Sequence, residues 1–318
     1  MADKSKIEWC DATWNPVTGC TPCSPGCERC YARTMLARHL PGMGHPGDPG
    51  TVTFHTDRLD IPLHWRKPRR IFVCSMSDLF HEDVPDEWRD RILARAAVCR
   101  RHTMMILTKR EIAMLRYIAP RAALQTRAEN VFEMAEIDGL TIWDARGDNP
   151  ANYLSVPGGA GDVSNRMAWP HWPLPNVWLG VTVCNQAEAD AKIPLLLDTP
   201  AALRFVSVEP MLGPVDVERW VLSDYDKAAH EPQLLTPRGG FTHRKLDWVI
   251  CGEETGPGAR KMKADWAGSL RDQCAAAGVP FFFKGWGTWG NLSKTHPDYM
   301  RIDGSEWRQF PEGGNGQN

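Results

Sequence analysis

The amino-acid sequence predicts an α/β protein, built as a partial or near-complete (β/α) barrel of about six to eight mostly parallel strands. Short apolar runs alternate with amphipathic stretches, which is typical of strands and helices that follow one another along a parallel sheet. The apolar runs are almost continuous, as in strands buried on both faces. The chain has 318 residues, of which 42% are hydrophobic and 24% charged, so it is long enough for one barrel of about 250 residues with insertions.

The first predicted strand lies near 13–17 and leads into a cysteine-rich loop. Later runs rich in Val, Ile, Leu and aromatic residues predict six more strands: 70–74, 103–108, 177–183, 203–208, 248–251 and 279–283. The amphipathic stretches predict five helices: 30–39, 85–101, 110–135, 185–198 and 264–277. The second of these has Pro85 followed by two acidic residues, which is typical of the first turn of a helix.

Two stretches interrupt this alternation, at about 136–175 and 223–245. Both are rich in polar residues, Gly and Pro, so we expect them to be insertions into a single domain that spans 1–318. Long insertions in barrels are commonly lids or binding loops. The polar tail, 311–318, is expected to be disordered.

The composition also limits the compartment and the partners that can be expected. The sequence contains no run of about 18 uncharged apolar residues, so no membrane span is expected. The N-terminus lacks the apolar stretch of a secretory signal, which predicts a cytoplasmic protein whose ten cysteines are mostly reduced thiols or metal ligands. The net charge of -2 provides no overall positive field for a polyanion, so any contact with nucleic acid must come from local patches.

Four of the cysteines lie close together, at Cys20, Cys23, Cys27 and Cys30. Two prolines and a glycine between them exclude regular helix or strand, so they form a loop whose thiols are suited to binding a metal. Three kinds of centre are compatible with this spacing: a zinc site, an iron–sulfur cluster with four cysteine ligands used for electron transfer, and a cluster with three cysteine ligands. The zinc site is disfavoured because the two Cys-x-x-Cys pairs are only three residues apart.

Segments around this loop carry a wider pattern: Ile7-Glu8-Trp9, Thr13-Trp14-Asn15-Pro16-Val17-Thr18-Gly19-Cys20, Ser24-Pro25-Gly26-Cys27 and Cys30-Tyr31-Ala32. The pattern resembles a family of bacteriophage and prophage proteins assigned to the radical S-adenosylmethionine (SAM) enzymes. The resemblance implies a barrel of the radical SAM type and a [4Fe-4S] cluster with one iron open to SAM. It favours Cys20, Cys27 and Cys30 as the ligands. The alternative set replaces Cys20 by Cys23, which completes the Cys-x-x-x-Cys-x-x-Cys motif of radical SAM enzymes.

Parallel barrels place their sites at the carboxyl ends of strands, so polar residues directly after the apolar runs are candidates. By analogy with radical SAM enzymes, Ser75, Ser77 and Asp78 are expected to contact the methionyl ammonium of SAM. Lys109 is expected to contact its carboxylate. Glu209 is expected to bind the ribose hydroxyls or the substrate.

The segment 252–260 resembles a second signature of the same family, normally Gly-Gly-Glu-Ser-Gly-Pro-Gly-Ala-Arg. Here Glu253 replaces the second glycine, and Arg260 is the final arginine. We expect both at the substrate, together with Lys284 and Trp286 after the last strand. Gly285 stands where the family usually has Gln, which predicts a larger pocket.

The resemblance implies an enzyme that cleaves SAM reductively and uses the resulting 5'-deoxyadenosyl radical to abstract hydrogen. It implies an electron donor such as flavodoxin or ferredoxin. A phage origin suggests DNA hypermodification in the cytoplasm of an infected bacterial host, with isomerisation of an amino-acid-substituted thymine as the expected reaction, by distant analogy to spore photoproduct lyase.

Local basic clusters are expected to hold the DNA phosphates: 66–70, 100–101 and 243–245. Two alternatives remain open. One is a zinc-knuckle module that binds nucleic acid without catalysis. The other is a radical SAM enzyme that acts on RNA, a peptide or a small metabolite.

Overall fold

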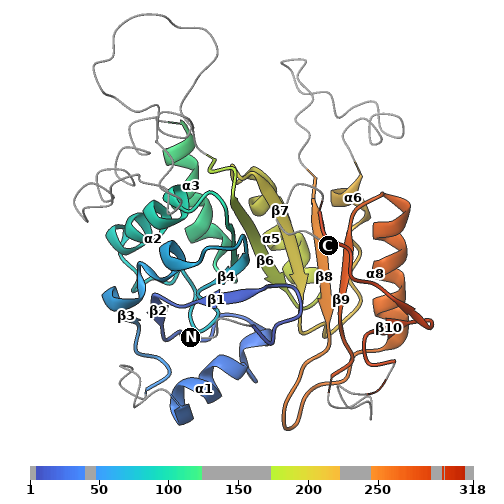
Figure 1. Ribbon diagram of the computed structural model, residues 1–318. Coiled ribbons are helices and arrows are strands. Elements are labelled where there is room, and N and C mark those ends of the chain that lie inside the picture. Colours follow the sequence, from blue (N-terminus) through green and yellow to red (C-terminus); the bar gives the residue numbers. More distant parts are fainter. Residues whose placement is uncertain are drawn as a thin grey trace, which may run out of the picture.

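The computed structural model describes residues 5–39, 48–123, 173–222, 245–287, 296 and 298–311 (Figure 1). Within these residues, seven strands form one open sheet whose spatial order follows the chain: β1 (Ala12–Trp14), β4 (Arg70–Val73), β5 (Thr103–Thr108), β6 (Val177–Val183), β7 (Leu203–Val208), β8 (Trp248–Gly252) and β9 (Phe281–Gly285). Every neighbouring pair is parallel. The sheet curls into part of a barrel, which confirms the predicted α/β fold class.

Helices cover the outer face of this sheet, and one helix follows the cysteine loop: α1 (Tyr31–His39), α2 (Asp86–Val98), α3 (Glu111–Ala123), α5 (Gln186–Asp198), α6 (Glu218–Val221) and α8 (Ala264–Ala276). Smaller elements complete the described part of the chain. They are the two-residue strands β2 (Val17–Thr18), β3 (Thr53–Phe54), β10 (Arg301–Ile302) and β11 (Ser305–Glu306), and three short 3-10 helices, η1 (Pro25–Cys27), η2 (Thr56–Arg58) and η3 (Ile61–His64).

Prolines account for two differences from the predicted strands. The strand predicted at 13–17 divides into β1 and β2, because Pro16 lies between them and has no N–H to donate to a ladder. β9 begins at Phe281, after Pro280, instead of at 279. The helix predicted at 110–135 runs to Ala123, and its remaining residues lie outside the described part of the chain.

The two faces of the sheet bury different residues. Val206 and Val208 belong to a large, mainly aliphatic cluster that also contains residues of the covering helices. Phe205 directly precedes Val206, so it points to the inner face, where it joins an aromatic cluster that includes Trp9, Phe72, Trp178, Trp248 and Phe282. A Cβ added at Gly180 would lie 2.5 Å from the Phe205 ring, so glycine is required there for that ring to fit. The aromatic cluster forms a floor inside the curled sheet.

The predicted insertions, 136–175 and 223–245, and the tail, 311–318, lie almost entirely outside the described residues. The described residues that flank the first insertion are the end of α3 and the start of β6, at the edge of the sheet where strands begin. None of the described helices is long and apolar enough to cross a membrane.

Candidate functional site at the carboxyl edge of the sheet

Polar side chains follow the aromatic floor toward the carboxyl ends of the strands. Side chains two residues apart share a face, so Thr182 follows Trp178 and Gly180 on β6, and Ser207 follows Phe205 on β7. These side chains line a cavity of about 140 Å³. The other lining residues come from the strand ends and the cysteine loop: Ile7, Trp9, Gly26, Arg29, Cys30, Tyr31, Phe72, Leu107, Lys109, Glu209, Pro210, Glu253, Glu254, Thr255 and Lys284.

An ion pair between Lys284 and Glu209 lies in this cavity. The Lys284 ammonium donates a short hydrogen bond to Glu209, and both side chains are mostly shielded from solvent. Burial alone would lower the pKa of Lys284, but the charge of Glu209 outweighs it and the pKa is raised. The lysine is therefore held in its charged form. A Cβ at Gly252 would lie 3.3 Å from both partners, so the glycine leaves them room.

The cysteine loop lies over this edge of the sheet. A Cβ at Gly26 would be 2.6 Å from the Cys184 Sγ and 3.6 Å from the Lys109 Cε, so the loop backbone touches the ends of β5 and β6. Cys30 lines the cavity directly. Burial would lower the pKa of Lys109, but the nearby thiols of Cys27 and Cys30 outweigh it and raise the pKa.

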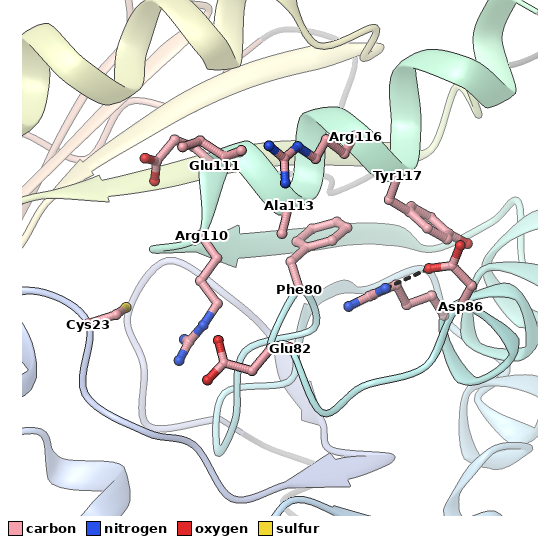
Figure 2. Close-up of a pocket in the computed structure, with 11 residues that line it drawn as sticks. Cys23, Phe80, Glu82, Asp86, Arg110, Glu111, Ala113, Arg116 and Tyr117 are labelled. Carbon is pink, nitrogen blue, oxygen red and sulfur yellow. Dashed lines mark hydrogen bonds and ion pairs between the residues drawn. The ribbon is translucent and has the colours of Figure 1, made fainter.

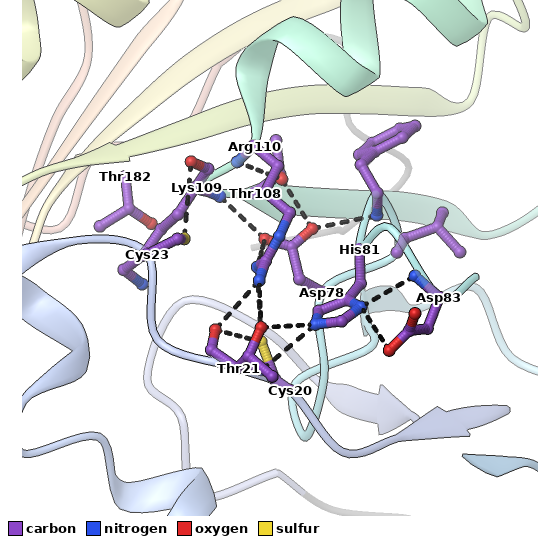
Figure 3. Close-up of polar contacts among 12 residues, drawn as sticks. Cys20, Thr21, Cys23, Asp78, His81, Asp83, Thr108, Lys109, Arg110 and Thr182 are labelled. Atoms are coloured by element: carbon purple, nitrogen blue, oxygen red, sulfur yellow. Dashed lines mark hydrogen bonds and ion pairs between the residues drawn. The ribbon is translucent and has the colours of Figure 1, made fainter. Parts of the chain in front are cut away.

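Asp78 organises the strand ends on the other side of the loop (Figure 3). Its buried carboxylate accepts hydrogen bonds from the Thr108 hydroxyl at 2.7 Å, the Lys109 backbone N–H at 3.0 Å and the Arg110 guanidinium at 3.4 Å. Burial opposes the positive charge of Arg110, but Asp78 outweighs it and raises the pKa of the guanidinium. Asp78 therefore fixes the turn that carries Lys109 and Arg110.

Arg110 connects this network to the cysteine loop. Its guanidinium donates to the Cys20 Sγ at 3.5 Å and to both the carbonyl and the hydroxyl of Thr21 at 3.0 Å. His81 lies 2.8 Å from the Thr21 hydroxyl on the other side (Figure 3). The first part of the loop is thus held by two side chains from neighbouring strand ends.

The four thiols have different environments. Burial raises the pKa of Cys20 to about 11. A hydrogen bond from Cys23, opposed by burial, lowers the pKa of Cys27 below the usual range of a thiol. Cys23 is exposed, whereas Cys27 is buried. The surroundings of Cys27 therefore favour the anionic form of its thiol, which is the form that binds metals.

The four loop thiols, all among the described residues, are not grouped closely enough to form a metal site in this structure. Among the described residues, no three His, Cys, Asp or Glu side chains lie close enough together to hold a metal ion. The donor chemistry nevertheless fits an iron–sulfur cluster, because thiolates are its usual ligands and two cations lie beside them. The residues fit a cluster in donor type and in charge, and the loop thiols must move closer to one another to complete its site.

The structure brings five of the predicted site residues into the cavity: Cys30, Lys109, Glu209, Glu253 and Lys284. Ser75 and Ser77 lie at the same edge but donate their hydroxyls locally, to the Asn15 side chain at 3.1 Å and to the Val17 carbonyl at 3.0 Å. Asp78 is likewise engaged by protein donors. The structure therefore gives these three residues a local role in the β4 turn.

Arg260 and Trp286 are not brought to the cavity. Arg260 donates to the buried Glu254 and also reaches the cysteine loop, at the Pro25 carbonyl, 3.0 Å away, and the Glu28 carboxylate, 2.9 Å away. The Trp286 indole donates to the Arg301 carbonyl at 2.9 Å. Arg260 ties two loops together, whereas Trp286 packs against the β10 segment.

Two departures from the family signature have structural partners. The Glu253 carboxylate accepts from the Met262 backbone N–H at 2.8 Å and also from that of Gly287, so it joins the loops after β8 and β9. A Cβ at Gly285 would lie 2.5 Å from the Tyr299 ring. The expectation that Gly285 enlarges the pocket is therefore wrong, because Tyr299 fills that space.

The cavity also contains residues that the predicted set omits: Arg29, Tyr31, Thr182, Ser207 and Glu254. Ser207 could have been predicted from the sequence, since it is a polar residue at an inner-face position of an otherwise apolar strand. Arg29 and Tyr31 could not have been predicted from strand ends, because their positions depend on the conformation of the cysteine loop.

A larger cavity, of about 490 Å³, lies on the outer side of the cysteine loop (Figure 2). It is lined by residues of α2, α3 and the β4–α2 loop, with Cys23 and Arg110 on the side toward the cysteine loop. It contains no inner-face residue of the sheet. The smaller cavity is the stronger candidate site, because the strand ends meet the cysteine loop there.

The predicted basic clusters lie at the opposite edge of the sheet. Residues 66–69 precede β4, Arg70 is its first residue, and residues 100–101 precede β5, so both clusters are at the amino ends of strands. Lys245 precedes β8, and 243–244 lie outside the described residues. The described basic residues of these clusters therefore lie away from the carboxyl edge, where the cavity and the cysteine loop are.

Comparison with known proteins gives a family but no activity. Searches of curated proteins and of solved structures returned no match. The profile of one protein family, DUF5131, described as a protein of unknown function, matches residues 4–311. This is nearly the whole chain, and the protein belongs to the DUF5131 family.

Proposed function

We propose that this protein is a radical SAM enzyme whose cysteine loop holds a [4Fe-4S] cluster through Cys20, Cys27 and Cys30, with Cys23 as the alternative to Cys20. The observation that carries the proposal is the position of Cys30. It lies in one cavity with Lys109, at the carboxyl edge of a partial parallel barrel. A ligand bound there meets a loop thiol and the inner face of the sheet together.

The charges around the loop support a thiolate-bound cluster. Lys109 lies beside Cys27 and Cys30, and the Arg110 guanidinium donates to the Cys20 Sγ at 3.5 Å. Positive charges stabilise the anionic form of cysteine, which is the form that binds metals. When bound, the cluster would supply the electron that cleaves SAM, while its open iron would hold the amino and carboxylate groups of SAM.

The residues of the cavity have distinct tasks in this proposal. The Lys284–Glu209 pair offers a cation and an anion at fixed positions, so it orients a polar ligand that carries both charges or ribose hydroxyls. Thr182 and Ser207 add hydroxyls on the adjacent strands. The aromatic floor beneath closes the inner end of the cavity and keeps water from the reacting carbon.

For the substrate, we propose a nucleic acid, and specifically an amino-acid-substituted thymine in phage DNA that is rearranged by isomerisation. This part rests on the resemblance to phage and prophage proteins. It includes an electron donor such as flavodoxin or ferredoxin and action in the cytoplasm of an infected host.

Two assays test the proposal. Protein purified without oxygen, reconstituted with iron and sulfide and then reduced with dithionite should convert SAM to 5'-deoxyadenosine, measured by chromatography. Glu209→Gln should lower the rate at least tenfold, whereas Asp216→Asn, an exposed carboxylate outside the cavity, should leave it unchanged. Protein that binds one zinc and leaves SAM intact would contradict the assignment as a radical SAM enzyme.

The substrate is tested by mass spectrometry of nucleosides from phage DNA that has been incubated with the active protein. Unchanged bases despite SAM turnover would contradict DNA as the substrate.

A further inference from the structure

Two loops at the amino edge of the sheet form a surface rich in basic residues. One loop comprises residues 61–70 and leads into β4, and the other comprises residues 99–103 and leads into β5. Neither stretch contains Asp or Glu, and together they contain six Lys or Arg residues: Arg66, Lys67, Arg69, Arg70, Arg100 and Arg101. This surface, called the amino-edge surface below, is at the end of the sheet opposite the cysteine loop.

Specific contacts hold the two loops against each other. Arg101 donates to the Trp65 carbonyl and to the Leu63 carbonyl, each at 2.8 Å. His102 lies 3.1 Å from the Pro62 carbonyl, and the Thr103 backbone N–H donates to the Arg69 carbonyl at 2.9 Å. The two loops are therefore fixed relative to each other, and their charges form one surface.

The acidic residues nearest in sequence are already occupied. Asp60 pairs with Arg95 of α2 at 3.0 Å, and Asp11 pairs with Arg70 at 3.1 Å. Arg66, Lys67 and Arg100 are exposed, and none of them pairs with an acid within the described part of the chain. The amino-edge surface therefore keeps a net positive charge although the whole chain carries -2.

We propose that the amino-edge surface binds the phosphate backbone of a nucleic acid. Clustered Arg and Lys on fixed loops are the usual means of contacting phosphates, and they act without reading the sequence. An acidic electron-transfer protein is the less suitable partner, because it has to approach the thiols of the cysteine loop at the other edge. The inference rests on the proposed function for the nature of the polyanion.

A nucleic acid is long enough to connect this surface to the cavity. β5 joins the two edges of the sheet over six residues, from Thr103 to Thr108, which is about 17 Å at about 3.3 Å per residue. A duplex rises about 3.4 Å per base pair, so a strand held at the amino edge has to extend by at least about five base pairs to reach the other edge. The amino-edge surface thus holds the polymer at a distance from the reacting base.

The test measures binding of a labelled 20-base-pair duplex to the whole chain at several salt concentrations. In the variant R66Q/K67Q/R100Q, the slope of log K against log salt should fall by about 2.7, since each lost phosphate contact removes about 0.9. The control variant R116Q/R219Q/R301Q removes three exposed arginines from α3, α6 and β10 and should keep the slope. Thermal melting of both variants checks that they are folded.

Further measurements separate this inference from the proposed chemistry. SAM cleavage without nucleic acid should be equal in the triple variant and the unchanged protein, because the cavity is at the other edge. An unchanged salt slope in the triple variant would overturn the proposal that the amino-edge surface binds nucleic acid. It would not affect the proposed SAM chemistry. Competition by poly-aspartate as effective as that by duplex of equal charge would also overturn it, since the surface would then bind any polyanion.

Discussion

The Arg260 guanidinium donates to the Glu28 carboxylate at 2.9 Å, across 232 positions of the sequence. The same guanidinium is bonded to the buried Glu254, so the loop after β8 is anchored to the cysteine loop. Gly258 lies in the same loop, and a Cβ there would meet the Arg29 guanidinium at 2.1 Å. The segment 252–260 thus supports the cysteine loop through direct contacts.

Arg260→Gln should therefore weaken both the fold and the loop. Glu254 would lose its partner while still buried, which should lower the free energy of unfolding by about 2 kcal/mol in urea titrations. Iron content after reconstitution should fall as well. The control Arg219→Gln breaks a pair with Asp190 in which both side chains are well exposed, and it should cost less than about 1 kcal/mol. Equal losses in the two variants would contradict this role of Arg260.

The Lys284–Glu209 pair should behave as one unit. Lys284→Met or Glu209→Gln alone leaves a partly buried charge without its partner, so each should destabilise the protein by about 2 kcal/mol or more. The double variant should lose less than the sum of the two, by at least about 1 kcal/mol. Unfolding free energies of all four proteins measure this coupling, and additive losses would show that the two side chains do not depend on each other.

Gly180 should tolerate no side chain. Its Cβ would press against the Phe205 ring of the aromatic floor, so Gly180→Ala should lower the free energy of unfolding by about 1 to 3 kcal/mol. At Gly213 the nearest atom to an added Cβ is 3.7 Å away, so Gly213→Ala serves as the matched control and should be nearly neutral. Urea unfolding measures the free energy of unfolding of both variants. A Gly180→Ala protein as stable as the unchanged one would contradict the close packing of Phe205 against Gly180.

His102 should make the protein sensitive to acid. Burial, together with the charge of Arg101, lowers the pKa of His102 from 6.5 to about 4. The unfolded chain then binds a proton that the folded chain does not, so stability falls as pH drops from about 6.5 to 4, by about 2 to 3 kcal/mol. Unfolding measured at pH 7.5 and pH 4.5 should show this loss in the unchanged protein and a smaller one in His102→Asn. Equal losses would assign the acid sensitivity to other groups.

The sequence allowed most of the sheet to be predicted because strands buried on both faces are continuous apolar runs. β5, β6 and β7 begin and end at the predicted residues. The two-residue strands were not predictable, since β2 and β3 pair over two residues each and leave no periodic pattern. The same limit applies to β10 and β11.

The candidate site was predictable to the extent that strand ends determine it. Lys109, Glu209 and Lys284 follow or end apolar runs, and all three line the cavity. Arg260 and Trp286 were assigned to the substrate from a signature alone, and the structure places them in contacts between loops. A sequence motif indicates that its residues belong to one site. Whether their side chains contact a ligand or contact one another depends on the conformation of the loop that carries them.

The most direct test of the central claim is the iron and sulfide content of oxygen-free protein in four single Cys→Ala variants. The unchanged protein should contain about four irons per chain. The variants of Cys20, Cys27 and Cys30 should lose the cluster, and the variant of Cys23 should retain it. A full cluster in Cys30→Ala, or a single zinc in the unchanged protein, would contradict a cluster held at the mouth of this barrel.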